Sequence, residues 1–443
     1  MINILFIMVI NSNRILHITN NDFDGEGHAV LRLHNGLLEL GANSKVLVLQ
    51  KKTKGKHIHS LGYCDAPSTL LSNLIKSFFY LDIGNSLKFL RFILFKLKVK
   101  YLHLKHKPIS LFNFGVRAIS FNELAIFLRD TDILVLHGVH DILSPNDVYR
   151  IHKNFSLKIF FHILDIEPIT GGCHFNFECK KYMIDCKDCP QIYNNSIAST
   201  TLDRKKELYK KIPINWIVPN TSTLDILKKS YIFDKSHTAS IIFMGIESNR
   251  YKKIDKDYAK DKLNLPDKPV ILFGCFNFSD KRKGAHILKQ SLSGWYVDKS
   301  KLINLHLVTF GELNDFSFKG IVPQWTHLGT IKSSEEMNIL YRSSDLLASP
   351  SIDDIGPATV VEAFMNHLPV VAFDIGVAKD LVKNNVNGSL VPCFNIEKFA
   401  LSILGCLLES DSLNYKNNKE LLLYKKRCTI RSEARELLML ACE

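Results

Sequence analysis

The feature that most constrains this chain is an alternation of strand and helix patterns that occurs twice. Short apolar runs of strand length are separated by segments in which apolar residues recur at helical spacing. Such runs are typical of strands that are buried on both faces of a parallel sheet. The first series comprises residues 14–18, 45–50, 132–136 and 157–161, and the second comprises residues 269–275, 305–311, 345–349 and 369–373.

Because the pattern restarts after Leu265, the sequence predicts two doubly wound α/β domains. A length of 443 residues is sufficient for two separate cores. We expect an N-terminal Rossmann-like domain over residues 1–225, a C-terminal one over 240–405 and a helical tail over 406–443.

The first strand run is followed by a turn that contains Gly25 and Gly27, and apolar residues from Val30 to Leu40 then recur at helical spacing. Glycines in this turn would let the backbone approach the phosphates or the sugar of a donor closely. A tight turn without a ligand is the simpler interpretation of the same two residues.

The net charge of +13 indicates an anionic partner: a nucleic acid, a membrane surface or an acidic ligand. The densest part is residues 88–107, which contain seven Lys or Arg and no acid, with apolar residues between the bases. This composition is typical of an amphipathic segment on an anionic lipid surface. A core helix or strand with a solvated basic face is the alternative, and the sequence leaves both open.

The apolar start of the chain, Met1–Ile10, is too short to span a bilayer, and no small-residue cleavage site follows it. We therefore expect a cytoplasmic protein. In a reducing compartment, clustered cysteines indicate metal binding before disulfides.

Residues 349–362, SPSIDDIGPATVVE, are the most informative stretch of the chain. They predict the end of a strand, a polar loop and a helix that Gly356 and Pro357 open. The backbone N–H groups of Ala358, Thr359 and Val360 would then face a phosphate at the positive end of the helix dipole.

Two acids flank this predicted phosphate cradle. Glu362 lies three residues after Thr359 on the same helix face, where its carboxylate can accept hydrogen bonds from ribose hydroxyls. Asp354 lies eight residues before Glu362, at the tip of the loop.

This stretch resembles the signature of retaining glycosyltransferase family four, in which two acids separated by seven residues precede a small-residue-Pro-Val-Val-Ala strand. The strand here is residues 368–372, and the turns at 376–380 and 387–391 match the family as well. The resemblance implies a GT-B fold, in which two Rossmann-like domains face each other across a cleft, and a nucleotide-sugar donor. Glu362 would bind the ribose, and Asp354, one methylene shorter than the usual glutamate, would approach the transferred sugar.

Arg282 and Lys283 follow a predicted strand and resemble the basic pair with which the family binds the donor diphosphate. Ligands of doubly wound domains bind at the carboxyl ends of the strands, where this pair is expected. Cations there would stabilise the departing nucleotide diphosphate. Asp354 and Asp165 would orient the sugar or the acceptor.

Residues 165–189 resemble a subgroup of the same family that acts in the synthesis of colanic-acid-like and O-antigen-like polysaccharides. The shared features are a Pro-x-Thr-Gly-Gly-Cys-His core and a later Cys-x-x-Cys-Pro. The subgroup's role in O-antigen and exopolysaccharide synthesis implies a lipid-linked glycan acceptor for the first domain. If residues 88–107 lie on an anionic lipid surface, they would hold the protein peripherally at the inner face of the plasma membrane, a location that fits this resemblance.

Within this segment lies a cysteine-rich insertion, residues 173–189, with the spacing C-x5-C-x6-C-x2-C. Its thiolates, Cys173, Cys179, Cys186 and Cys189, would suffice for a closed, tetrahedral structural zinc site. The same spacing is also compatible with reduced structural thiols or with disulfides. We expect no catalytic metal, because four protein ligands leave no open position and the family generally needs none.

Relatives in the subgroup place a histidine directly before the aspartate that aligns with Asp165, and here that position is Leu164. His162, His137 and His140 are weaker substitutes for a general base. The resemblance implies retention of configuration by front-face attack of the acceptor hydroxyl. The departing phosphate would accept the proton, so this route requires no protein base.

The sequence therefore predicts a retaining glycosyltransferase of bacterial surface polysaccharide synthesis that uses a nucleotide-sugar donor. A catalytically inactive GT-B protein that only binds nucleotide sugars is the first alternative. A basic, zinc-containing nucleic-acid-binding protein is the second, but the cysteine array lacks interleaved aromatic and basic residues, so we expect no nucleic-acid partner. A sugar epimerase on the same fold is a third.

Overall fold

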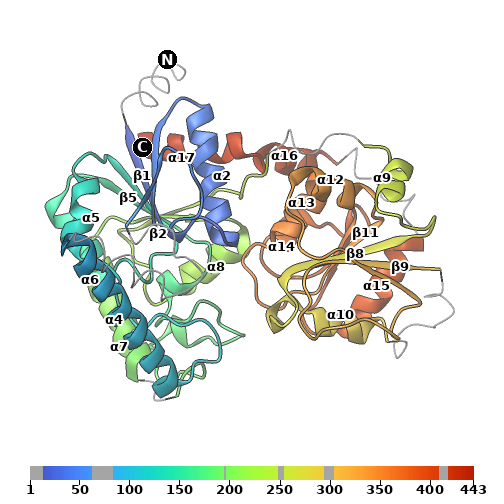
Figure 1. Cartoon of the computed structure of the whole chain (residues 1–443), viewed down its shortest axis with the longest axis horizontal. Coiled ribbons are helices and arrows are strands. Elements are labelled where there is room, and N and C mark those ends of the chain that lie inside the picture. Colours follow the sequence, from blue (N-terminus) through green and yellow to red (C-terminus); the bar gives the residue numbers. More distant parts are fainter. Residues whose placement is uncertain (1–12, 62–82, 194–195, 248–253, 294–303, 409–417) are drawn as a thin grey trace. The chain divides into compact units, whose positions relative to one another are not determined.

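The computed structural model describes residues 13–61, 83–193, 196–247, 254–293, 304–408 and 418–443. These residues form two units, each built on one sheet with helices packed against it (Figure 1). Unit 1 comprises the residues up to Pro219, Leu224–Gly245 and Ile430–Glu443, and unit 2 comprises Asn220–Thr223 and Ile246–Thr429. Met1–Ile10, the predicted apolar start, lies outside the described residues.

The sheet of unit 1 contains seven described strands, all parallel, in the order β3-β2-β1-β4-β5-β6-β7. The winding therefore reverses between β1 and β4, and a doubly wound sheet binds ligands at the carboxyl ends of the strands beside such a reversal. The strands are β1 (Arg14–Asn21), β2 (Asn43–Gln50), β3 (Ile58–Ser60), β4 (Ile133–Leu136), β5 (Lys158–His162), β6 (Asn215–Val218) and β7 (Thr238–Ile241).

The sheet of unit 2 has six described strands, also parallel, in the order β10-β9-β8-β11-β12-β13. Its winding reverses between β8 and β11, which is the same topology as in unit 1. The predicted fold class, two doubly wound parallel-sheet domains, is therefore confirmed. The strands are β8 (Val270–Asn277), β9 (His306–Glu312), β10 (Gln324–His327), β11 (Leu346–Ser349), β12 (Val370–Phe373) and β13 (Gly388–Val391).

Helices connect the strands in both units. Those of unit 1 are α2 (Gly25–Glu39), α4 (Ile83–His106), α5 (Phe121–Leu128), α6 (Pro145–Asn154), α7 (Ser196–Tyr209), α8 (Thr221–Lys229, whose first residues are counted with unit 2) and α17 (Ile430–Cys442). Those of unit 2 are α9 (Lys256–Lys262), α10 (Ala285–Ser291), α12 (Ser334–Arg342), α13 (Ala358–Met365), α14 (Ala378–Leu381), α15 (Ile396–Leu408) and α16 (Lys419–Arg427).

Helix α2 illustrates how the sequence pattern becomes packing. Its buried face includes Val30, Leu33 and Leu37, three of the positions that recur at helical spacing. The helix ends at Glu39 with Leu40 as its C-cap, and Gly41 follows with a φ of +84°, a left-handed conformation that closes a helix terminus at little cost for glycine.

The last helix of the chain, α17, belongs to unit 1, where it packs against α2 (Figure 1). Ala434, Leu437 and Leu438 join the core formed by α2 and the sheet. The predicted tail, residues 406–443, is thus divided between the two units, and residues 409–417 lie outside the described part of the chain. Helical periodicity predicts that such a segment is helical, but it does not indicate against which sheet the helix packs.

A buried carboxyl group joins α17 to the segment that follows β7. Glu433 is 2% exposed, and its Oε2 accepts a hydrogen bond from the Gly245 N–H at 2.7 Å. Burial raises the pKa of Glu433 from 4.5 to about 8, so the folded protein holds this carboxyl protonated at neutral pH.

We predict that Glu433 makes unit 1 less stable as the pH rises. Because the folded-state pKa lies above the unfolded value, the stabilisation is complete below about pH 4.5 and is lost as the pH rises through about 8. Glu433→Gln, which mimics the protonated form, should match the wild type at pH 5 and exceed its melting temperature at pH 8.5. Thermal unfolding across this range measures the effect. Glu39→Gln, an exposed position on α2, is the control, and parallel pH profiles of wild type and Glu433→Gln would contradict the prediction.

Candidate active site

Two loops meet at the point in unit 2 where the winding of the sheet reverses. The loop after β8 contains a 3-10 turn, η4 (Lys281–Lys283), and the loop after β11 leads into α13. The Ile352 N–H donates to the Arg282 carbonyl at 2.8 Å and so joins the two loops. Gly284 has a φ of +75°, and an added Cβ would lie 2.0 Å from the Pro350 carbonyl oxygen. Only a glycine therefore permits this close approach.

The predicted basic pair lies in this junction. Lys283 forms an ion pair with the Asp354 carboxylate, and the two side chains are only 26% and 12% exposed. Arg282 donates to the Asp280 carboxylate at 2.6 Å and to the Asp353 carbonyl at 3.2 Å. The structure thus brings Lys283 and Asp354 together, although they are 71 residues apart in the chain.

The phosphate cradle predicted at the start of α13 is smaller than expected. The helix begins at Ala358 and Pro357 is its N-cap, so the proline precedes the first turn instead of belonging to it. The Val360 N–H donates to the Pro357 carbonyl at 3.0 Å, and this tight first turn occupies one of the three predicted donors. Ala358 and Thr359, both partly exposed, carry the remaining N–H groups at the positive helix end.

Glu362 lies one turn further along α13 and is partly exposed. Its Oε2 accepts a hydrogen bond from the Tyr341 hydroxyl at 2.7 Å, which fixes the carboxylate relative to α12. Tyr341 is a site residue that no sequence motif indicated. It continues the apolar face of α12 and is 1% exposed, so its position in the sequence indicates a core residue.

Phe276 is a second candidate residue that the sequence did not reveal. It lies near the carboxyl end of β8 and is 74% exposed, although the strand residues before Gly274 are buried. An exposed ring beside the ligand-binding edge of a sheet offers a surface for stacking. The residue sits in an apolar strand run, so only the structure shows that its side chain is exposed.

A second polar group lies at the carboxyl ends of β1, β4 and β5 in unit 1. Asp165 accepts hydrogen bonds on both oxygens: Oδ1 from the Glu167 N–H at 2.8 Å, and Oδ2 from His174 Nδ1, with 2.6 Å between the heavy atoms. Burial alone would lower the pKa of His174, but the charge and hydrogen bond of Asp165 outweigh it and raise the pKa. Asp165, which the sequence predicted to orient the sugar or the acceptor, thus has both carboxylate oxygens hydrogen-bonded by neighbouring residues.

Glu26, which no sequence pattern singled out, lies at the same edge of unit 1. Its Oε1 accepts hydrogen bonds from the Thr19 hydroxyl at 2.5 Å and from the Gly138 N–H at 2.8 Å. Burial, followed by the nearby negative charge of Asp165, raises the pKa of Glu26 from 4.5 to about 7.

The three histidines considered as bases differ in accessibility. His137 and His162 are each 2% exposed, and burial lowers the pKa of both, in His162 to about 4. They are therefore neutral core residues. His140 is partly exposed, and its ring lies edge-on to that of His174, with 4.6 Å between the centroids.

The two glycines of the first turn in unit 1 have different surroundings. An added Cβ at Gly27 would lie 2.5 Å from the Asn21 carbonyl oxygen, and the Gly27 N–H already donates to the Asp24 cap at 2.8 Å. A tight turn therefore accounts for Gly27. An added Cβ at Gly25 would meet nothing within 4 Å, so this position remains open for the predicted approach of a ligand.

The four cysteines of the insertion are free thiols, and in the described part of the chain no three His, Cys, Asp or Glu side chains converge as metal ligands. The zinc prediction is therefore not supported. Burial, together with the charge of the neighbouring thiols, raises the pKa of Cys173 to about 12 and that of Cys186 to about 11. Reduced structural thiols, which the spacing also allows, fit this geometry.

We predict that these thiols are poor nucleophiles in the folded protein. Since the thiolate is the reactive form, a pKa of about 12 for Cys173 and about 11 for Cys186 leaves both thiols protonated at pH 8. Iodoacetamide at pH 8 should modify the exposed Cys442 well before Cys173 or Cys186. Peptide mapping by mass spectrometry measures the order, and equal modification of all three residues in native protein would contradict it.

The geometry of unit 2, in which a basic turn and a helix N-terminus flank the reversal of a parallel sheet, is typical of domains that bind nucleotides and their phosphates. In agreement, residues 255–421 match the family model of the glycosyl transferases group 1, which covers less than half of the chain. No curated protein matches the chain significantly.

Solved structures match over both units. The chain resembles sucrose-phosphate synthase from Thermosynechococcus elongatus at 14% identity and a TM-score of 0.65, with 97% of this chain and 98% of that one covered. It resembles a glycosyltransferase from Rickettsia africae at 15% identity and a TM-score of 0.60, with the same coverage. It also resembles Anabaena HepE, solved with UDP-glucose, at 14% identity and a TM-score of 0.60, with 97% and 99% covered. These likenesses show that the chain has the GT-B fold.

Proposed function

We propose that this protein is a retaining glycosyltransferase that transfers a sugar from a nucleotide-sugar donor to a lipid-linked glycan in bacterial surface polysaccharide synthesis. The observation that carries the proposal is the junction of unit 2, where Arg282, Lys283 and the start of α13 meet at the reversal of the sheet. The match of this part of the chain to the glycosyl transferases group 1 supports it.

The donor chemistry follows from this junction. A nucleotide diphosphate would be held by Lys283, Arg282 and the N–H groups of Ala358 and Thr359, which neutralise the charge that develops as the glycosidic bond breaks. Asp354 pairs with the Lys283 ammonium group, so a diphosphate must compete with this carboxylate. Asp354, once released, is free to contact the transferred sugar.

The ribose contact is proposed for Glu362, and the finer details of the reaction are proposed from the resemblance of the sequence. Tyr341 holds the Glu362 carboxylate in place. A carboxylate that is fixed in this way can accept hydrogen bonds from the ribose hydroxyls. Retention of configuration, a colanic-acid-like or O-antigen-like product and a lipid-linked acceptor are proposed from the motifs of residues 165–189 and 354–362. UDP-glucose, which HepE binds, is the first donor to try.

A transfer assay with UDP-, GDP- and other nucleotide sugars, run beside a thermal-shift measurement with each donor, tests the proposal. We expect at least one donor to stabilise the protein and to be consumed, by transfer or by slow hydrolysis. Stabilisation without any turnover would favour the inactive nucleotide-sugar-binding protein. The absence of both would refute the proposal.

In the same assay, we predict that Lys283→Ala and Glu362→Ala each reduce kcat/KM by about tenfold or more, because each removes a charged hydrogen-bonding contact. Asp354→Ala should bind the nucleoside diphosphate at least as tightly as the wild type, because it removes the competing carboxylate, yet transfer poorly. Asp354→Glu should retain activity or change the preferred sugar. Lys281→Ala, the exposed neighbour in the same turn, is the control. Normal turnover of Lys283→Ala or Glu362→Ala would show that the donor site is wrong.

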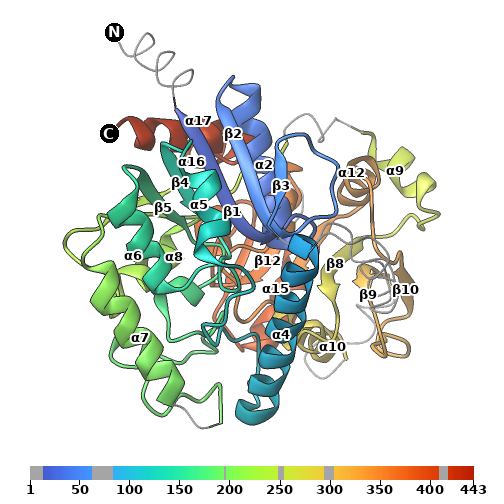
Figure 2. The same ribbon diagram turned by 60° about the vertical axis from the view of Figure 1, so that its left-hand side comes forward.

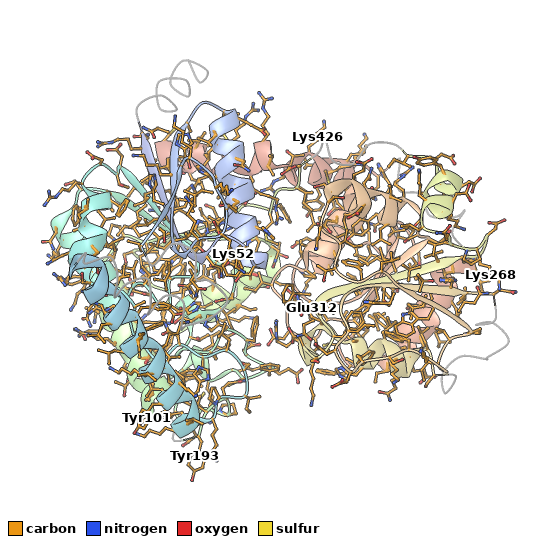
Figure 3. All side chains as sticks on the ribbon, viewed as in Figure 1. Lys52, Tyr101, Tyr193, Lys268, Glu312 and Lys426 are labelled. Carbon is orange, nitrogen blue, oxygen red and sulfur yellow. The ribbon has the colours of Figure 1, made fainter. Side chains whose placement is uncertain are left out.

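Helix α4 supports the proposed membrane attachment. It is a 24-residue helix at the edge of unit 1 (Figure 2), and Tyr101 lies near its carboxyl-terminal end (Figure 3). In the described residues, no helix is long and apolar enough to cross a membrane. Phe95 is buried, so one face packs on the unit, whereas large apolar side chains on the other face are more than half exposed: Leu90, Leu94, Leu97, Tyr101 and Leu104.

These five exposed side chains, the α4 stripe, line up along the helix. Since successive residues are about 100° apart around an α-helix, the stripe spans only about 80° and is about 21 Å long. The same geometry places Lys98 and Lys105 on one side of it and Lys96 and Lys100 on the other, and all four lysines are exposed. The helix therefore has the packed face and the solvated basic face of the core-helix alternative, and it also carries an exposed apolar stripe.

The charge on α4 decides which partner fits the stripe. Residues 88–107 contain no acid, so a second copy of the helix would bring like charges together, whereas anionic lipid headgroups would neutralise the lysines. The stripe would then enter the headgroup and acyl boundary. We therefore propose that the protein binds peripherally to the anionic inner face of the plasma membrane.

We predict that the full chain floats with vesicles of phosphatidylcholine containing phosphatidylglycerol but not with phosphatidylcholine alone, because each lysine near an anionic leaflet contributes about 1 kcal/mol. Flotation should fall with salt and with glutamate at Lys96, Lys98 and Lys100. Leu94→Ser with Leu97→Ser should weaken it at every salt concentration. Glutamate at the exposed Lys54, Lys153 and Lys210 changes the charge equally and is the control. No flotation, or equal flotation with both vesicles, would rule out the attachment.

A further inference from the structure

The polar edge of unit 1 contains a carboxyl group that the proposed mechanism does not use. Glu26 is the second residue of α2 and lies where the winding reverses between β1 and β4. Thr19 contributes its hydroxyl from the end of β1, and Gly138 contributes its N–H just after β4. Both donate to Oε1 of Glu26, so two strands hold this carboxyl group in one orientation.

The backbone at Gly138 leaves room for the carboxyl group of Glu26. A Cβ added at Gly138 would lie 2.1 Å from both Glu26 carboxyl oxygens, so any side chain at position 138 would displace the group. Among the described residues, Oε2 of Glu26 has no protein hydrogen-bond partner, and the residue is partly exposed. One oxygen therefore serves to anchor the group and the other can accept a hydrogen bond from a ligand.

A second polar atom without a partner lies close by. His174 is 1% exposed, and its Nδ1 bonds to Asp165, while its Nε2 is buried and has no hydrogen-bond partner in the described part of the chain. The charge of His174 acts on Glu26, as do those of Asp165 and Asp24. A buried imidazole nitrogen without a partner costs free energy, which a ligand group or a water molecule would recover.

The charges at this edge indicate the class of ligand. Lys205 is 2% exposed, and its Nζ donates hydrogen bonds to the Glu167 carboxylate and to the backbone carbonyls of Glu167 and Thr170. With Glu26 and Asp165 facing the site, a phosphate would meet more negative than positive charge. A neutral ligand with several hydroxyl groups suits it better, because each hydroxyl both donates and accepts hydrogen bonds.

We propose that Glu26 binds a saccharide hydroxyl of one of the two substrates through its Oε2, with Thr19 and Gly138 holding the carboxyl group in place. The inference rests on the proposed sugar transfer. The saccharide is that of the glycan acceptor or that of the donor, and both present the same chemistry. The role of Glu26 is to bind and orient a hydroxyl; no proton transfer to it is required.

Burial and the charge of Asp165 also make this contact sensitive to pH. They raise the pKa of Glu26 to about 7, and Asp24 acts in the same direction, whereas Thr19 and His174 oppose the shift. The ionised carboxylate, the stronger acceptor of a hydroxyl hydrogen bond, therefore predominates only above about pH 7. Binding of the saccharide should weaken as the pH falls through this value.

Steady-state rates between pH 6 and 8.5 test the proposal with wild type, Glu26→Gln and the control Glu39→Gln, which lies at the exposed end of the same helix. Glutamine retains an oxygen for Thr19 and Gly138, so the variant should fold, and thermal unfolding checks this. We expect Glu26→Gln to raise the KM of one substrate by about tenfold above pH 7 and to abolish the rise of that KM at lower pH. A change in the acceptor KM identifies the acceptor saccharide, and a change in the donor KM identifies the donor sugar.

Unchanged KM values and an unchanged pH profile in Glu26→Gln, beside an active wild type, would overturn this inference and leave the proposed transfer intact. If the wild type transfers no sugar, the proposed function fails separately. Binding of labelled protein to a saccharide array then tests Glu26 directly. Weaker binding by Glu26→Gln than by the wild type and Glu39→Gln supports the inference, and either no binding by the wild type or equal binding by all three proteins overturns it.

Discussion

The candidate sites depend on close approach between backbone segments at the two points where a parallel sheet reverses its winding. In unit 2, Gly284 lies against the Pro350 carbonyl and brings the basic turn next to the loop that opens α13. In unit 1, Gly138 leaves space for the carboxyl group of Glu26. Either contact would be blocked by a single Cβ atom, so the positions of the polar side chains follow from the backbone and not from the side chains alone.

The two reversals have the same topology but different electrostatics. At the reversal of unit 2, two cations, each paired with a carboxylate, lie beside a helix N-terminus, and cations with a helix N-terminus favour phosphate. At that of unit 1, Glu26 and Asp165 flank a single histidine whose pKa is raised, an arrangement that disfavours phosphate. One fold used twice therefore offers two chemically distinct sites. A nucleotide diphosphate and a neutral saccharide are the ligand classes that we propose for them.

The sequence predicted the centre of each sheet better than its edges. All eight predicted runs are strands, because central parallel strands are apolar on both faces. Five of the described strands were missed. The edge strands β3, β7 and β10 contain polar residues and have no such pattern, and the fourth edge strand, β13, lies where the sequence predicted a turn. The interior strand β6 is apolar but short, and it was missed as well. The return of α17 to unit 1 was missed as well, since helical periodicity does not indicate a packing partner.

Candidate site residues within one motif, such as Asp354 and Glu362, can be named from the sequence, whereas the contacts that the fold adds to them cannot. The ion pair between Lys283 and Asp354 and the hydrogen bond from Tyr341 to Glu362 join distant segments, which no local pattern specifies. The cysteine array shows the converse, because ligand spacing in the sequence does not ensure that the thiols converge.

Leu164 is an apolar residue at a position where the resemblance implies a base, and the polar groups of this edge of unit 1 lie at other positions. The resemblance of the sequence implies a histidine at this position, whereas the leucine here packs against an apolar cluster that contains Val30 and Val46. A histidine there would place polar nitrogens beside that cluster, at a desolvation cost unless each found a partner. The polar groups of this edge are instead Asp165, which holds His174, and Glu26, which is anchored by Thr19 and Gly138. In the proposed front-face route, the departing phosphate accepts the proton of the acceptor hydroxyl, so this route requires no histidine base. It does require that a hydroxyl be oriented, which a fixed carboxyl group can provide.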